Sequence, residues 1–289
     1  MLESLVYLRS NPTSASVARR EPDNQQETVT DMIKVMGSSE TTRQMTHMNQ
    51  KLAMLLGFLY TDGCVSPKGK SWRIYFAVKS QELVDLFRDC VVTTFAIDPK
   101  RVRVRVRTSG LTAAVVDSKS IGTYLTTRFG TFRTLKFENG DLPKTKLPVS
   151  ALKKSGYVED FLRVAFSCDG GVSLYPAMRN SKNGKTKWLI RTVFISCAHP
   201  QMRSDYLALL KSLGIYVRNV ATDGKLKIER ERDIRLFAKK IGFVDGVKAT
   251  LDSKFWSGYE KNEVLRILIN SYGQPATIYQ LPKFSESMI

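Results

Sequence analysis

Two aspartates at the ends of apolar stretches are the residues best placed to do chemistry. Asp62 follows one such stretch and Asp169 follows another, and glycine comes directly after each acid. A helix without a polar face is buried on all sides. Gly63 predicts a left-handed cap that leaves Asp62 in the last helical turn, and the second stretch repeats the order of an apolar run, Asp169 and Gly170. A carboxylate there opposes the partial negative charge of the free helical carbonyls. A single case would indicate no more than a helix-to-loop junction, so the repeat of the pattern is what matters.

The spacing of the two aspartates indicates a duplication. They lie 107 residues apart, which fits one small domain copied twice. Two buried helices lying parallel would bring the carboxylates together beside two sets of free carbonyls. Like charges at short range repel, so a cation is expected between them. An oxygen-rich, acidic site favours a hard divalent cation, Mg²⁺ first, with Mn²⁺ as another candidate.

Both stretches resemble the LAGLIDADG motif of homing endonucleases, in the single-chain form that carries two copies. Leu55 to Gly63 and Leu162 to Gly170 fill its nine positions. The resemblance implies that both aspartates are catalytic and bind metal. It also implies that the carbonyls just before them face the metal. These carbonyls belong to Thr61 and Cys168.

The two copies depart from the motif at two places. The earlier, usually non-catalytic acid of the family is Tyr60 in one copy and Ser167 in the other. The glycine that lets the two motif helices pack closely is kept as Gly57 and replaced by Val164.

The resemblance also implies a basic residue at the end of the second strand of each half, near the attacking water. Lys79 fits this position in the first half, although a surface lysine would fit the sequence equally well. The corresponding Ser196-Cys197-Ala198 contains no basic residue. There, a lysine of the nearby hairpin would have to substitute: Lys182, Lys185 or Lys187.

The implied fold is α+β, with two pseudo-symmetric αββαββα halves and a saddle of antiparallel sheets around the central pair of motif helices. Apolar periodicities agree with this order of elements along roughly residues 50–243. The expected division is a flexible N-terminal leader at 1–46, a first half at 47–130, a linker at 131–156, a second half at 157–245 and a C-terminal extension at 246–289, packed on the second half.

The charge of the chain points to a polyanionic partner. Its 45 basic and 27 acidic residues give a net charge of +18. Residues 1–46 hold five basic and six acidic residues, so residues 47–289 carry 40 and 21, a net charge of +19. Nucleic acid is the first candidate. No run of 18 apolar residues spans a bilayer, and the basic residues alternate with strand-like apolar ones, which disfavours a membrane surface.

Cysteine and histidine usage excludes several site types. The four cysteines form no C-x-x-C pair and so predict no zinc motif. Scattered cysteines and the lack of a signal peptide predict an intracellular protein of a prokaryotic cytoplasm or an organelle matrix. Only two histidines are present, which disfavours histidine-based nuclease and hydrolase sites.

Arginine alternates strictly with valine in residues 101–107, which predicts a strand with four arginines on one face and the valines on the other. Such a face gains nothing for folding, so it indicates a nucleic-acid contact. The residues predicted to contact DNA are Arg73, Arg101, Arg103, Arg105, Arg107, Arg179, Lys182, Lys187, Arg191 and Lys225.

The function expected from the resemblance is site-specific cleavage of both DNA strands by a monomer, through Mg²⁺-dependent phosphodiester hydrolysis, in a protein associated with an intron or intein. Two alternatives use the same fold. One is an intron maturase that binds RNA, which the retention of both acids disfavours. The other is a non-catalytic DNA-binding regulator, which would have lost metal binding.

Overall fold

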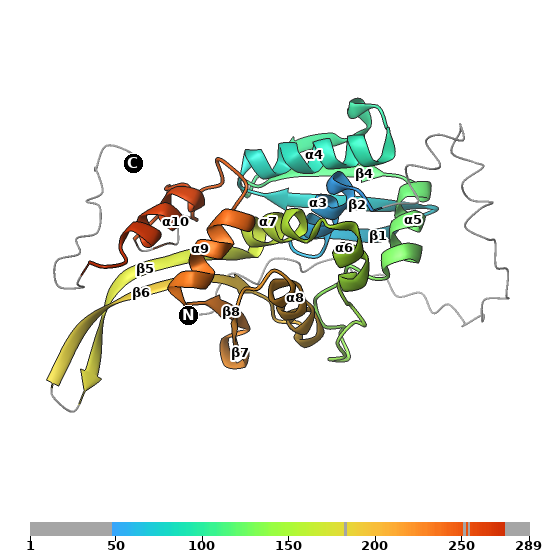
Figure 1. Ribbon diagram of the computed structural model, residues 1–289. Helices are drawn as coiled ribbons and strands as arrows, with labels where there is room; N and C mark the ends of the chain where they lie inside the picture. Colours follow the sequence, from blue (N-terminus) through green and yellow to red (C-terminus); the bar gives the residue numbers. More distant parts are fainter. Residues whose placement is uncertain (1–47, 182–183, 251–252, 254, 275–289) are drawn as a thin grey trace.

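A computed structural model describes residues 48–181, 184–250, 253 and 255–274 (Figure 1). The predicted leader at 1–46 therefore lies outside the described residues, as does its boundary with the first half. The first half runs helix, two strands, helix, two strands, helix, as predicted. Its elements are α3 (Gln50–Leu59), β1 (Gly63–Lys68), β2 (Ser71–Val78), α4 (Gln81–Phe95), β3 (Arg103–Val106), β4 (Thr112–Asp117) and α5 (Lys119–Phe129).

The second half repeats this order. Its elements are α7 (Val158–Asp169), β5 (Gly170–Ser181), β6 (Gly184–Ser196), α8 (Pro200–Ser212), β7 (Arg218–Val220), β8 (Lys225–Ile228) and α9 (Glu231–Lys240). Shorter or additional helices are η1 (Pro99–Arg101), α6 (Val149–Ser155), η2 (Ala221–Asp223) and α10 (Lys261–Asn270). Helix α6 lies within the predicted linker. No helix in the described ranges is both long and apolar enough to cross a membrane.

Each half contains a four-stranded antiparallel sheet, in the order β1-β2-β4-β3 and β5-β6-β8-β7. One face of each sheet is packed against helices. In the first sheet this face carries the buried Ile74 and Phe76, and in the second it carries the buried Val193 and Ile195. The alternate side chains lie on the other face, which the helices of the same half leave uncovered. The predicted α+β fold of two αββαββα halves is confirmed by this topology.

The helices α3 and α7 pack against each other at the centre of the molecule (Figure 1). Every residue of α3 from Leu52 to Leu59 is buried, as predicted for a helix without a polar face. A Cβ on Gly57 would lie 2.8 Å from the carbonyl oxygen of Phe161 and 2.9 Å from the Cβ of Val164. The valine in one motif copy therefore packs into the space left by the glycine in the other.

The prediction that Gly63 forms a left-handed cap is wrong, and its counterpart Gly170 does not form one either. Neither has a positive φ, and Gly170 is extended, with φ −110° and ψ 175°. Each glycine is the first residue of a strand that folds back over the end of its helix. A Cβ would lie 2.6 Å from the carbonyl oxygen of Phe58 or Phe166, respectively. Close approach to the helix backbone is what requires glycine.

The two positions where the motif departs from its usual acid serve as structural anchors. The Tyr60 hydroxyl donates to the Phe129 carbonyl oxygen at 2.9 Å, and its ring is buried. The Ser167 hydroxyl donates to the Arg163 carbonyl oxygen at 2.7 Å and accepts from the Val244 amide at 2.8 Å. These bonds tie the motif helices to the ends of the two halves.

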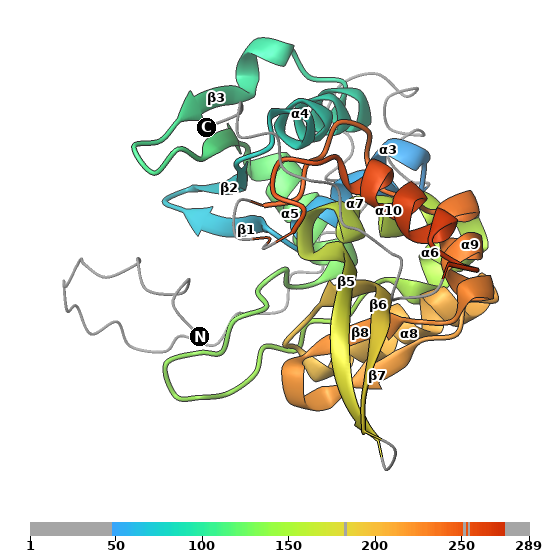
Figure 2. The same cartoon turned by 90° about the vertical axis from the view of Figure 1, so that its left-hand side faces the viewer.

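The described part of the C-terminal extension packs on the second half, as predicted. Trp256 Nε1 donates to the Leu174 carbonyl oxygen of β5 at 2.7 Å. The Arg191 guanidinium donates to the Ser271 hydroxyl at 2.8 Å and to the Ser271 carbonyl oxygen at 2.6 Å. Helix α10 lies beside α9 and β5 (Figures 1 and 2).

Candidate functional site

The two motif aspartates lie at the junction between a central helix and an edge strand. Asp169 is the last residue of α7, as predicted. Asp62 lies in the turn between α3, which ends at Leu59, and β1, so it is not in the helix itself. Thr61 closes this turn because its hydroxyl donates to the Gly57 carbonyl oxygen at 2.9 Å. Since α3 and α7 pack together, the helix ends bring both acids to one place.

The electrostatics of the acids reflect this proximity. Burial first, and the charge of Asp62 second, raise the pKa of Asp169 from 3.8 to about 8. Burial among protein atoms also raises the pKa of Asp62, although its side chain keeps contact with solvent. Burial raises the pKa of Cys168 well above its usual value, the charge of Asp62 adds to this, and a hydrogen bond with Thr61 opposes it. The structure therefore brings together all four residues predicted to surround the metal.

A lysine that the sequence analysis did not single out lies beside these acids. Lys261, the first residue of α10, is only 7% exposed. Its ammonium ion donates to the carbonyl oxygens of Ser167 at 2.7 Å and Gly170 at 2.8 Å. Its positive charge acts to lower the pKa of both aspartates. The sequence pattern could have indicated a buried lysine here, because Lys261 lies on the same helical face as the apolar and buried Val264, Leu265 and Leu268.

The donor set fits a hard divalent cation. Two carboxylates and two backbone carbonyl groups offer only oxygen, which is what Mg²⁺ prefers. Within the described residues, no group of three or more His, Cys, Asp or Glu side chains could hold a metal. A site with two carboxylates suits Mg²⁺, which commonly completes its coordination with water and substrate phosphate.

The pairing of β1 with β2 places Lys79 at the edge of the site formed by the two aspartates. It is exposed and follows the last residue of β2. Phe76 pairs with Gly63, so the end of β2 lies next to the start of β1 and to Asp62. In the second half Ile195 pairs with Gly170, and the residue equivalent to Lys79 is Ala198. The catalytic role of Lys79 stays a prediction.

Two of the three hairpin lysines, Lys185 and Lys187, are too far away to replace a basic residue near Asp169. Lys187 pairs with Met178, eight residues beyond Gly170, and Lys185 pairs with Asn180. At about 3.3 Å per residue, Lys187 lies roughly 26 Å along the ribbon from the site. Lys182 lies outside the described residues.

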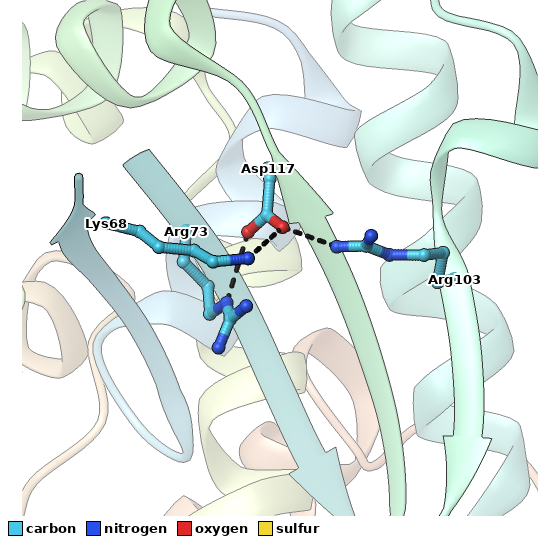
Figure 3. Close-up of polar contacts among 4 residues, drawn as sticks. All are labelled: Lys68, Arg73, Arg103 and Asp117. Atoms are coloured by element: carbon cyan, nitrogen blue, oxygen red, sulfur yellow. Dashed lines mark hydrogen bonds and ion pairs between the residues drawn. The ribbon is translucent and has the colours of Figure 1, made fainter. Parts of the chain in front are cut away.

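The helix-free face of the first sheet is strongly basic. Arg73 and Arg103 project from it, and both form ion pairs with Asp117, as does Lys68 (Figure 3). The bond from Lys68 and those from the two arginines hold the pKa of Asp117 far below its usual value. Arg105 lies on the same face, since it pairs with Ala113 just as Arg103 pairs with Val115. Three cations around one carboxylate leave a local excess of positive charge.

The predicted four-arginine strand is only partly formed. Strand β3 spans Arg103–Val106, while Arg101 belongs to η1 and Arg107 follows the strand. The Arg107 guanidinium lies over the Tyr75 ring, 5.0 Å from its centroid. The opposite face of the strand is not buried, because Val104 is 39% and Val106 is 75% exposed. Strand β3 is short and lies at the edge of the sheet, so no helix of the described residues covers these two valines.

The second sheet extends into a long two-stranded ribbon. Strand β6 pairs with β8 only from Val193 to Ser196, so the rest of the β5–β6 hairpin has no third strand among the described residues and extends away from the sheet (Figures 1 and 2). Lys225 lies on the helix-free face with its ammonium ion 5.0 Å from the Phe194 ring centroid. The side chain of Arg179 lies outside the described part of the structure.

Arg191 occupies a different place from the one predicted. It shares the helix-covered face with Val193 and is bonded to Ser271 of the C-terminal extension. Its guanidinium also lies 4.8 Å from the Tyr272 ring centroid. We therefore leave it out of the DNA-contacting surface.

Comparison with known proteins gives structural neighbours only. No family model and no curated protein matches the sequence. A solved structure of I-SmaMI bound to cleaved DNA is 12% identical, with a TM-score of 0.39, over 67% of this chain and 84% of that one. I-SmaMI is a LAGLIDADG homing endonuclease.

I-DmoI in complex with its target DNA is also similar. A structure in the presence of magnesium is 14% identical, with a TM-score of 0.44, over 69% of this chain and 97% of that one. Another, with nicked target DNA and manganese, is 14% identical, with a TM-score of 0.43, over 66% of this chain and 94% of that one. TM-scores below 0.5 establish no shared function, so the contacts within this chain carry the proposal below.

Proposed function

We propose that this protein is a metal-dependent endonuclease that cuts both strands of a specific DNA target by phosphodiester hydrolysis. The observation that carries the proposal is the meeting of Asp62 and Asp169 at the ends of two packed, buried helices. Their charges raise the free energy of the folded protein, as the raised pKa of Asp169 indicates. Carboxylates placed at such a cost are typical of functional sites.

The proposed metal site uses Asp62 and Asp169, with the carbonyl groups of Thr61 and Cys168. Mg²⁺ held by these groups would supply an activated water and would stabilise the leaving 3′ oxygen. Both carboxylates keep contact with solvent, so a metal ion and a DNA phosphate could reach them. Lys79, exposed at the end of β2, is the candidate for orienting the attacking water in the first half.

The proposed DNA surface is the helix-free face of the two sheets. A strand ribbon fits the major groove, where arginine pairs with guanine and both arginine and lysine neutralise phosphates. The residues proposed to contact DNA on this face are Arg73, Arg103, Arg105, Arg107 and Lys225. Arg101, Arg179 and Lys182 are further proposed contacts. Lys187 is left out with Arg191, because it shares the helix-covered side of β6 with Arg191 and Val193. Ion pairs with Asp117 preorganise Arg73 and Arg103 on this surface.

The test is incubation of the purified full chain with duplex DNA, using a library together with DNA spanning the insertion site of its own gene. With Mg²⁺ we expect defined double-strand breaks with short 3′ overhangs, and with EDTA none. Ca²⁺ should support binding without cleavage, because it accepts looser coordination geometry.

The same experiment separates the alternatives. Tight binding of the surrounding intron RNA without DNA cleavage would indicate a maturase. Specific DNA binding that ignores divalent ions would indicate a regulator. Association with an intron or intein and action as a monomer belong to the proposal as well, and sedimentation of the DNA complex tests the latter.

A further inference from the structure

The buried cation of the site comes from outside the two repeated halves. Lys261 begins α10, and its backbone amide donates to the Val247 carbonyl oxygen at 2.8 Å. Asn262 fixes the same region, since its side chain accepts from the Phe243 amide and donates to the Phe243 carbonyl. The start of α10 is therefore attached to the segment that follows α9, and Lys261 has little freedom to leave the site.

The Lys261 ammonium ion is bonded to the backbone around the second motif aspartate. Its two acceptors, the carbonyl oxygens of Ser167 and Gly170, bracket Cys168 and Asp169. Carbonyls at a helix C-terminus carry partial negative charge and lack intrahelical partners. By bonding to one carbonyl on each side, the ammonium ion fixes the backbone that carries both a carboxylate and a carbonyl of the proposed metal site.

The two halves differ at this point. The first half has Lys79 at the end of its second strand, whereas the second has Ala198. Lys185 and Lys187 of the hairpin are too distant to compensate. Within the part of the chain that the structure describes, Lys261 is the lysine that donates hydrogen bonds to backbone carbonyl oxygens at the end of α7.

We propose that Lys261 is a positioning residue of the nuclease site, holding the end of α7 so that Asp169 and the Cys168 carbonyl are oriented toward the divalent ion. Helix α10 is then part of the catalytic unit rather than an accessory to the second half. This inference rests on the proposed endonuclease function. Residues that orient metal ligands typically contribute about 10- to 100-fold to metal affinity or activity.

The test compares Lys261→Met with Arg266→Met, which removes an exposed cation from the same helix. The first readout is the Ca²⁺ concentration at which binding of the intact DNA target, the one that the wild type cleaves in Mg²⁺, is half-maximal. Lys261→Met should raise it about tenfold or more, whereas affinity without divalent ions and the Arg266→Met values should stay within about twofold of wild type. The second readout, single-turnover cleavage in Mg²⁺, should slow about 100-fold for Lys261→Met.

Further variants keep the test decisive. Lys261→Gln replaces Lys261→Met if the latter does not fold, since an amide can still donate to one carbonyl. Lys261→Arg retains the charge and should recover part of the cleavage rate.

Two results would overturn the inference. A lower Tm with unchanged Ca²⁺ requirement and cleavage would make Lys261 a structural cap only. A lower Ca²⁺ requirement would make it a charge that competes with the metal. Failure of the wild type to cut any DNA, or binding that ignores divalent ions, would instead refute the proposed function itself.

Discussion

Replacing Asp169 by asparagine should change the stability of the protein in a pH-dependent way. Burial and the charge of Asp62 raise the pKa of Asp169 from 3.8 to about 8. An acid with a raised folded-state pKa binds its proton more tightly in the folded protein. It therefore costs no stability below about pH 4 and an increasing amount as the pH rises toward about 8. Asparagine is neutral throughout, so Asp169→Asn should gain stability over wild type across this interval.

The size of the gain follows from the pKa change. A difference of one in pKa corresponds to about 1.4 kcal/mol, so the full change from 3.8 to about 8 corresponds to roughly 6 kcal/mol. Asp169 is only partly buried, and water screens its interactions. We therefore expect a gain of about 2 kcal/mol, which raises Tm by roughly 4–8 °C in a domain of this size.

The assay is thermal unfolding of both proteins in EDTA at about pH 5 and about pH 8.5. The Tm of Asp169→Asn minus that of wild type should be larger at the higher pH. Asp85→Asn, which alters an exposed carboxylate on α4, is the control and should show no such trend. An equal difference at both pH values, or a lower Tm for Asp169→Asn at the higher pH, would refute the reasoning.

Three further predictions concern packing and the basic surface. Gly57→Ala should cost about 2 kcal/mol in urea unfolding, because its Cβ would lie 2.8 Å from the Phe161 carbonyl oxygen; an unchanged midpoint would contradict the close helix contact. Asp117→Asn should lower Tm at neutral pH, since three cations share this carboxylate. Its pKa is lowered, so the Tm difference should shrink as the pH falls below about 4; a constant difference would argue against these pairs. Arg103→Ala with Arg105→Ala should reduce the salt slope of DNA binding by about one to two, and an unchanged slope would place the DNA surface elsewhere.

The order of elements could be predicted because it depends on local periodicity and on a repeated motif. The apolar residues of α3 predicted a buried helix, and all residues from Leu52 to Leu59 are buried. The repeat of Asp-Gly after two apolar stretches predicted that Asp62 and Asp169 would meet. Their interaction in the folded chain follows from the packing of α3 on α7.

The remaining features depend on contacts between distant segments. Strand alternation separates two faces but does not say which face a helix covers, so the side on which Arg191 lies could not be assigned. Lys261 is 92 residues from Asp169 in sequence and reaches the site only because α10 packs against β5. The need for glycine at position 63 comes from a strand folding back on a helix, which resembles a left-handed cap in sequence alone.

The measurement that tests the central claim most directly is single-turnover cleavage of the target by Asp62→Asn and Asp169→Asn in Mg²⁺, with binding measured in Ca²⁺ and Asp85→Asn as the control. Both variants should stay folded, keep specific DNA binding and lose cleavage of at least one strand, because each lacks a carboxylate that positions metal. The control should cut at the wild-type rate. Wild-type cleavage by either motif variant, or loss of folding in both, would contradict the paired-carboxylate site.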